Sequence, residues 1–600
     1  MHVDGQVKQC IHLLIEEKGN MITPRQRYSG PTVGYFSMEV GLSPDIPTYS
    51  GGLGVLAGDT LRAAADLDMP MIGITLLHRQ GYVRQHLDSV GNQSESPRSW
   101  DPSAQLEAMD PIVTIEIDNR PVQIRAWRYE IHGSVNGGRV PVYFLDTFLP
   151  ENDSEAQKLT DNLYGGDQHY RLSQEAVLGL GGVAMLSALG HTDVDVFHMN
   201  EGHAALLAIE LLRLQLDSRP PGDLTDHDLE TVRGHCVFTT HTPVPAGHDQ
   251  FPEQLVRQVL GEHISEVIRA SSCFQDGALN MTFLALRFSR YVNGVALRHG
   301  EVARSMFPQY PIDSITNGVH ATTWTSPPFQ RLFDSYIPEW RKDNLYLRYA
   351  VSLPLEAVAN AHLEAKEAFF HEIDRRTGTT LDPLVLTLGF ARRATPYKRA
   401  DLLFTDTARL RRIADRFGPF QIVFGGKAHP RDEGGKELIR RVYRAASELS
   451  DVVRVVYLED YDMSLGMLFC SGVDVWLNTP QKPLEASGTS GMKAALNAVP
   501  SLSVIDGWWV EGHVEGITGW AIGNDRPESD TEQEISSLYD QLEFSIAPMY
   551  YKRPLDFAAI GRWSIALNGS FFNAQRMVSQ YAMNAYQHVA REPELMLAEV

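Results

Sequence analysis

Cysteine is scarce in this chain, and the few cysteines form no recognisable framework. The 600 residues contain four, at positions 10, 236, 273 and 470, which lie far apart and form no Cys-x-x-Cys pair. This spacing argues against structural disulfides and against a zinc site built on cysteine. The chain also lacks an apolar run of membrane-spanning length and a signal-peptide pattern at its N-terminus. We therefore expect a soluble, reduced, cytoplasmic protein.

An excess of positive charge is also missing. Lys and Arg number 53 against 75 Asp and Glu, which gives a formal net charge of −22. Such a balance disfavours nucleic acid and anionic membranes as partners. Because the overall field repels anions, any phosphate ligand needs a local cluster of Lys and Arg. Clustered cations are therefore the first places to look for a site.

Short β-branched runs alternate with glycine turns and helical stretches along the whole chain, a pattern typical of parallel α/β domains. Six hundred residues exceed one compact core, so we expect two α/β domains. The segment Trp324-Thr-Ser-Pro-Pro328 breaks regular structure, so we place the boundary there, with domains at 1–325 and 326–600. Ile112–Ile117 and Val122–Tyr129 predict an antiparallel hairpin inside the first domain. The other predicted strands are Val33–Ser37, Met71–Leu76, Val140–Leu145, Val194–His198, Cys236–Thr240, Val385–Gly389, Gln421–Phe424, Val452–Tyr457, Val473–Leu477 and Ser501–Ile505.

The strongest local signal is a loop of small residues that ends in a lysine. It reads Glu485-Ala-Ser-Gly-Thr-Ser-Gly-Met-Lys493 and leads into an apolar, helix-like stretch. Backbone N–H groups at a helix start attract anions, and small residues let a ligand approach closely. The lysine could bind phosphate or act as an amine nucleophile toward an aldehyde cofactor. A plain turn before a capped helix is the structural alternative.

A second signal is a cluster of cations directly after a buried-looking strand, in Gly389-Phe-Ala-Arg-Arg-Ala-Thr-Pro-Tyr-Lys-Arg399. Four cations within eight residues are costly at such a place unless they face solvent or an anion. Arginine offers planar donors to phosphate oxygens, and lysine offers a compact charge. The segment therefore indicates either a phosphate site or a solvated loop.

Three shorter motifs lie at predicted strand ends or turns. Ser50-Gly-Gly-Leu-Gly54 precedes a helical run and predicts a glycine turn with exposed N–H groups. His241 follows the strand that contains Phe238, and Asn317 begins an Asn-Gly pair. Taken alone, each motif is more typical of a turn or a structural histidine than of a ligand site.

Together these segments resemble the glycogen and α-glucan phosphorylases, in family order along most of the chain. The resemblance implies a GT-B-like α/β fold, with two Rossmann-like domains facing a deep interdomain cleft. By analogy with such glycosyltransferases, the last helix-like segment (573–591) would cross back to the first domain. The resemblance also implies phosphorolysis of terminal α-1,4-linked glucose from glycogen or maltodextrin, with retention, to give α-D-glucose 1-phosphate. The length matches the compact prokaryotic type, so no allosteric regulation is expected.

The resemblance further implies a role for each candidate residue. Pyridoxal 5′-phosphate would be bound as a Schiff base on Lys493, and the expected catalytic residues are Lys493, Arg393, Lys398 and His241. The cofactor phosphate would be held with the help of Arg392, Lys398, Tyr461, Thr489 and Ser490. The substrate would be bound by Gly52, Leu53, His241, Asn317, Glu485, Ser487 and Gly488. No metal site is expected, because His198 and His203 have no evident third ligand.

Two other functions are compatible with parts of this pattern. A nucleotide-sugar-dependent retaining glucosyltransferase, similar to glycogen synthase, would use a similar glycine loop. Tyr49 stands where those enzymes usually have lysine, which mildly favours a phosphorylase. An inactive glucan-binding protein would have no reason to keep Lys493, Arg393 and Lys398 together. A homodimer is common in the family and is a further expectation, although no interface can be derived from the sequence.

Overall fold

The computed structural model describes residues 30–244 and 247–587. Within that range the chain forms two compact units. The N-terminal unit comprises Gly30–Arg84, Glu95–Gly318 and residues 577–587, and the C-terminal unit comprises Gln85–Ser94 and Val319–Arg576. No helix among the described residues is long and apolar enough to cross a membrane.

The N-terminal unit is built on one nine-stranded sheet in the order β14-β13-β9-β8-β1-β2-β7-β6-β5. Seven neighbouring strands, from β14 to β7, are parallel, and β6 and β5 add an antiparallel hairpin at one edge. The bounds are β1 (Val33–Ser37), β2 (Met71–Leu76), β5 (Glu107–Ile117), β6 (Arg120–His132), β7 (Arg139–Asp146), β8 (Val196–Asn200), β9 (Cys236–Thr239), β13 (Tyr291–Gly294) and β14 (Asp313–Ser314).

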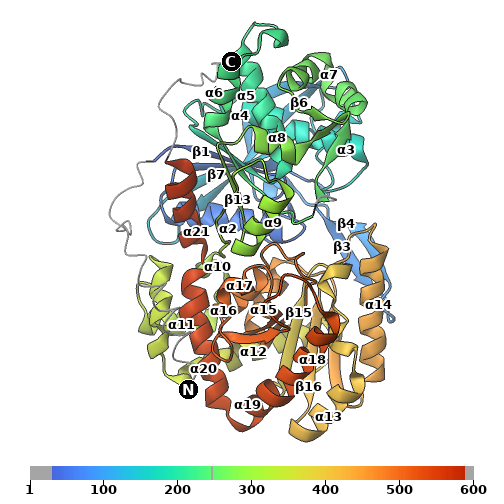
Figure 1. Cartoon of the computed structure of the whole chain (residues 1–600), viewed down its shortest axis with the longest axis vertical. Coiled ribbons are helices and arrows are strands. Elements are labelled where there is room, and N and C mark those ends of the chain that lie inside the picture. Colours follow the sequence, from blue (N-terminus) through green and yellow to red (C-terminus); the bar gives the residue numbers. More distant parts are fainter. Residues whose placement is uncertain (1–29, 245–246, 588–600) are drawn as a thin grey trace. The chain divides into compact units, whose positions relative to one another are not determined.

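Helices cover this sheet, and one core cluster joins all of them except the helix at 52–66 to the strands. Figure 1 shows α2 on one side of the sheet and α4 and α5 on the other. The helices are α2 (Gly52–Asp66), α3 (Gln168–Ala176), α4 (Gly182–Ala188), α5 (Leu206–Leu216), α6 (Asp226–His235), α7 (Glu253–Ala270), α8 (Met281–Arg287) and α9 (Leu297–Met306). A small sheet of β10 (Gln250–Pro252), β11 (Phe274–Gln275) and β12 (Ala278–Asn280) completes the unit.

The C-terminal unit contains a six-stranded parallel sheet in the order β17-β16-β15-β18-β19-β20. Along β16 the side chains of Ile422 and Phe424 belong to one core cluster and that of Val423 to another. Because successive side chains of a strand point to opposite faces, both faces of this sheet are buried. The strands are β15 (Leu386–Ala391), β16 (Phe420–Gly425), β17 (Val453–Leu458), β18 (Val475–Asn478), β19 (Ser501–Val504) and β20 (Gly519–Ile522).

The helices of the C-terminal unit pack on both sides of its sheet (Figure 1). They are α10 (Ala321–Trp324), α11 (Pro327–Tyr336), α12 (Leu355–Thr377), α13 (Thr407–Phe417), α14 (Glu433–Glu448), α15 (Met463–Gly472), α16 (Ser490–Ala495), α17 (Trp509–Gly512), α18 (Thr531–Asp540), α19 (Ala547–Lys552) and α20 (Pro554–Ser564). The hairpin of β3 (Val83–Leu87) and β4 (Gln93–Pro97) lies beside α14, where the position of a Cβ on Gly91 would be 2.6 Å from the Tyr443 ring.

The predicted α/β class with parallel sheets is confirmed, and most predicted strands are present. The antiparallel hairpin forms as β5 and β6, with the additional strand predicted at 140–145 pairing as β7. Strand β8 begins and ends two residues later than predicted. The sequence analysis missed β20, the β3–β4 hairpin and every strand from β10 to β14. Of the predicted last helix, α21 (Ala574–Tyr581) and a π-helical turn (Ala582–Tyr586) are seen, and residues 588–591 lie outside the described residues.

Candidate active site

A buried cluster of charges lies beyond the carboxyl ends of β15 and β18 in the C-terminal unit, where ligands of parallel α/β sheets bind. The Lys398 Nζ lies 2.5 Å from Glu485 Oε2, and the Arg392 Nη1 lies 2.8 Å from the same oxygen. Arg392 also donates to Asn478 Oδ1. The side chains of the two cations and of Glu485 are nearly completely buried. Buried cations need a compensating negative charge, and here one carboxylate compensates two cations.

The two cations and the carboxylate shift each other's protonation. Burial and the neighbouring charge of Arg392 lower the pKa of Lys398 to about 7, although Glu485 opposes this shift. Burial alone would raise the pKa of the Glu485 carboxyl, but Arg392 and Lys398 outweigh it and lower that pKa to about 2. The cluster therefore has an excess of positive charge that a second anion would relieve.

Arg393 differs from these two cations because its side chain is exposed. It still lies near enough to Lys398 to contribute to lowering that pKa. The chain between Arg393 and Lys398 is hydrogen-bonded to the loop that follows β16, since Ala394 N donates to the carbonyl of Lys427 at 2.9 Å. An exposed arginine beside a buried, cationic cluster is well placed to bind an incoming phosphate.

Lys493 lies on α16 and is a buried residue, with 8% of its surface exposed. Its Nζ is 3.7 Å from the ring centroid of Trp324, a cation–π distance. The position of a Cβ on Gly466 would be 2.8 Å from the Tyr461 hydroxyl and 3.7 Å from the Trp324 ring. The absent side chain at Gly466 therefore lets Tyr461 and Trp324 pack close together, beside the amine of Lys493.

The segment that follows β19 forms hydrogen bonds with the loop that precedes α16. Asp506 Oδ2 accepts the N–H of Glu485 at 2.9 Å, and Trp508 N donates to the Ser487 carbonyl at 2.8 Å. A Cβ at Gly507 would be 2.5 Å from that carbonyl, so a larger residue at 507 would displace the loop. The Ser487 Oγ is buried and has no hydrogen-bond partner among the described residues. Thr489 and Ser490 form the start of α16.

In the N-terminal unit, a buried carboxylate holds the glycine loop. Glu39 accepts the N–H of Ser50 at 2.5 Å and that of Gly51 at 3.4 Å. A Cβ at Gly54 would lie 2.7 Å from the Glu39 carboxylate, which explains the last glycine of the motif. Helix α2 begins at Gly52, and a Cβ there would meet nothing within 4 Å, so the space beside this residue is open.

His241 and Asn317 also belong to the N-terminal unit. His241 follows β9 and is half-buried, and Asn317 is buried with its N–H bonded to the Val295 carbonyl at 3.0 Å. Burial lowers the pKa of His241 to about 4, although Glu201 opposes this shift, so the imidazole is neutral at pH 7. Leu53, in the first turn of α2, is half-buried.

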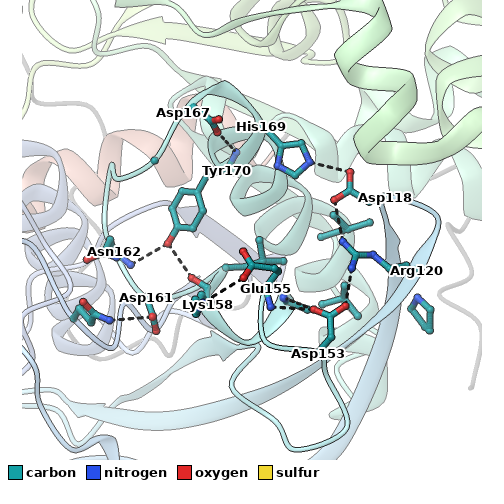
Figure 2. A pocket seen from close by; sticks show the side chains of 17 residues that line it. Asp118, Arg120, Asp153, Glu155, Lys158, Asp161, Asn162, Asp167, His169 and Tyr170 are labelled. Carbon is teal, nitrogen blue, oxygen red and sulfur yellow. Dashed lines mark hydrogen bonds and ion pairs between the residues drawn. The ribbon is translucent and has the colours of Figure 1, made fainter.

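A separate cavity of about 580 Å³ in the N-terminal unit contains none of the candidate residues. Figure 2 shows Arg120 lying between Asp118 and Asp153, and His169 directed toward Asp118. Carboxylates outnumber cations in its lining, which makes it a poor site for phosphate. Its charged and histidine side chains are Asp118, Arg120, Asp153, Glu155, Lys158, Asp161, Asp167 and His169.

Comparisons with known proteins identify the family of this chain. A family model described as carbohydrate phosphorylase matches residues 265–515. The maltodextrin phosphorylase of Thermococcus litoralis is 38% identical over 97% of this chain and 73% of its own length. The glycogen phosphorylase of Aquifex aeolicus is 35% identical over 94% of this chain and 87% of its own length, and that of Mycobacterium tuberculosis is 37% identical over 93% and 71%. This chain belongs to the carbohydrate phosphorylase family.

Within this phosphorylase the candidate residues form two groups, one in each unit. The C-terminal unit brings together Arg392, Lys398 and Glu485, and it places Lys493 beside Trp324 and near Tyr461. The N-terminal unit holds the glycine loop, His241 and Asn317. The contact between Lys398 and Glu485 was not expected, since the resemblance assigned the lysine to phosphate and the glutamate to sugar.

Sequence reasoning missed several residues that shape these two groups. Trp324 was interpreted only as part of a break in regular structure, and Glu39 and Asn478 were not singled out. Asn478 had a usable signal, because it is a polar residue at the end of a buried strand. Glu39 had none, since its role depends on a loop eleven residues later in the chain.

Proposed function

We propose that this phosphorylase releases terminal α-1,4-linked glucose from maltodextrin or glycogen by phosphorolysis and forms α-D-glucose 1-phosphate with retention. The observation that carries the proposal is the buried Lys493 on the small-residue loop, in a chain of this family. The relatives are named maltodextrin and glycogen phosphorylases, which does not favour the nucleotide-sugar alternative.

Phosphorylases of this family generally depend on pyridoxal 5′-phosphate, and the residues of this chain fit that group. Lys493 offers a buried amine for covalent attachment, and the buried Ser487 Oγ is a polar atom in need of a partner. The 5′-phosphate would be held by Arg392, Lys398, Tyr461, Thr489 and Ser490. When bound, the cofactor supplies a phosphate that takes part in proton transfer.

Substrate phosphate would be bound by Arg393, Lys398 and the N–H of Gly52. Lys398 has three N–H donors, so it can keep its contact with Glu485 and still donate to a phosphate oxygen. The bound phosphate would offset the excess positive charge around Arg392 and Lys398. The exposed Arg393 adds planar donors from the open side of the cluster.

In the reaction, the glycosidic C–O bond breaks, a proton from the substrate phosphate reaches the leaving oxygen, and an oxygen of that phosphate bonds to the anomeric carbon on the same face. Phosphate oxygens held by Arg393 and Lys398 stabilise the positive charge that develops on the sugar. The sugar would be oriented through its hydroxyls by Leu53, His241, Asn317, Glu485, Ser487 and Gly488. Excluding water from this site favours transfer to phosphate over hydrolysis.

The direct test is an assay of purified protein with maltoheptaose and inorganic phosphate, followed by ³¹P NMR. We expect phosphate to be consumed and α-glucose 1-phosphate to appear, with no requirement for a nucleotide. Transfer that needs ADP-glucose or UDP-glucose and ignores phosphate would contradict the proposal. Glucan binding without either reaction would indicate an inactive binding protein.

We expect phosphate use to weaken as pH rises above neutrality. The pKa of Lys398 is lowered to about 7, so its positive charge is lost between pH 7 and 9, well below the range of an ordinary lysine. The KM for phosphate should therefore rise, by up to about tenfold per pH unit. Lys398→Arg is the matched control, because guanidinium stays charged and should flatten this dependence. Identical pH profiles of KM in the two proteins would contradict the role of Lys398.

Two expectations from the sequence stay predictions. One is the interdomain cleft of a GT-B-like fold, with domains at 1–325 and 326–600. The other is a homodimer.

A further inference from the structure

The loop that carries His241 is held by two consecutive residues at the end of the neighbouring strand β8, Asn200 and Glu201. One binds the imidazole ring and the other binds the main chain. Building on the proposed function, we infer that Asn200 and Glu201 are positioning residues for His241. Glu201 fixes the backbone, and Asn200 selects the ring tautomer whose Nδ1 accepts a hydrogen bond from a sugar hydroxyl.

Glu201 fixes the backbone through a buried carboxylate. Its Oε2 accepts the N–H of His241 at 2.8 Å and the hydroxyl of Thr242 at 2.9 Å. Its Oε1 accepts the N–H of Gly202 at 3.0 Å. Glu201 has φ of +76°, which is a strained conformation for a residue with a side chain. Such strain persists only where the surrounding contacts favour it, and here they hold the start of the His241 loop.

Asn200 binds the ring, since its Oδ1 lies 2.7 Å from His241 Nε2. The orientation of the Asn200 amide is fixed on its other side by Ser37, on strand β1. Ser37 donates its hydroxyl proton to the Glu39 carbonyl at 2.8 Å, so its oxygen is left to accept from Asn200 Nδ2 at 3.1 Å. The amide oxygen must therefore face the ring, and His241 Nε2 must carry the proton.

The chain of hydrogen bonds from Ser37 through Asn200 to His241, the Ser37–Asn200–His241 relay, determines what His241 can bind. A neutral imidazole carries one ring proton, and Asn200 keeps that proton on Nε2. The remaining nitrogen, Nδ1, is then an acceptor, and no described residue is hydrogen-bonded to it. An acceptor at this place pairs with a hydroxyl donor and repels a phosphate oxygen or a carbonyl. The geometry thus suits a neutral polyol such as a glucan end.

The first test is ¹⁵N NMR of protein labelled at histidine, with the His241 signals assigned by their loss in His241→Gln. We expect wild-type His241 to be protonated at Nε2. Asn200→Ala removes the acceptor and should shift the tautomer toward Nδ1–H. Asn200→Asp restores an acceptor and should restore Nε2–H, with a raised pKa because a carboxylate faces the ring. Protonation of wild-type His241 at Nδ1, or an unchanged tautomer in Asn200→Ala, would overturn the inference whether or not the protein is active.

The second test is kinetic and separates the two residues. Asn200→Ala should lower kcat/KM for maltodextrin by roughly tenfold or more while the KM for phosphate stays close to wild type. Glu201→Gln replaces one of the two acceptor oxygens with an amide N–H, so the N–H of either His241 or Gly202 loses its acceptor. Activity should fall while the tautomer remains Nε2–H. Asn136→Ala, at an exposed asparagine of the same unit, is the control and should leave both readouts unchanged. Wild-type kinetics in Glu201→Gln would overturn its role.

Discussion

Replacing Lys493 with alanine is expected to abolish both cofactor incorporation and phosphorolysis. The amine of Lys493 is buried against Trp324. Lys493 is the one lysine in the described loop 485–493. Alanine removes the only group on this loop that can form a covalent link to the cofactor aldehyde. The purified variant should lack the cofactor absorbance in the near ultraviolet and visible range, and glucose 1-phosphate formation should fall below detection.

Two control variants make this result interpretable. Lys493→Arg keeps a positive charge beside Trp324 but cannot form the covalent link, so it should be as inactive as Lys493→Ala. Lys342→Ala removes an exposed lysine of the same unit and should retain both absorbance and activity. A Lys493→Ala protein that is active without bound cofactor would refute the assignment.

Replacing Arg393 with alanine is expected to damage phosphate use with little effect on folding. Arg393 is exposed, so its loss should change the free energy of unfolding by less than about 0.5 kcal/mol. Charge-assisted hydrogen bonds are worth about 1.5–3 kcal/mol. We therefore expect the KM for phosphate to rise by roughly ten- to a hundredfold, measured by initial rates at saturating maltodextrin.

The controls for Arg393 test charge and geometry separately. Arg393→Lys keeps the charge without the planar pair of donors and should give an intermediate KM. Arg412→Ala removes an exposed arginine from α13 of the same unit and should behave as wild type. If the rate depended on phosphate concentration identically in Arg393→Ala and wild type, Arg393 would have no part in phosphate binding.

The sequence predicted the sheets well because their strands are buried on both faces and read as short apolar runs. It also located the candidate loops, since ligand loops follow such strands and here carry glycine or clustered cations. Strands β13 and β20 were missed because each has four residues and contains or begins with glycine. The β3–β4 hairpin was missed because its anchors are distant: Gln85 and Gln93 donate to the carbonyls of Gly426 and Ala428.

Side-chain pairing between distant segments lay beyond sequence reasoning. The contact of Lys398 with Glu485 joins positions 87 residues apart, and nothing local to either residue indicates it. The relay from Ser37 through Asn200 to His241 depends on three adjacent parallel strands, β1, β8 and β9. Strand order is a property of the folded sheet, so these contacts follow from topology rather than from local motifs.

The central claim is that a cofactor aldehyde is covalently attached to Lys493, and borohydride reduction of wild-type protein tests it most directly. After reduction and proteolysis, mass spectrometry should find the reduced pyridoxal phosphate adduct on the peptide that contains Lys493. The account predicts this single modified lysine, with a matching loss of absorbance on reduction. An unmodified Lys493 peptide in protein that catalyses phosphorolysis, or an adduct on another lysine, would contradict it.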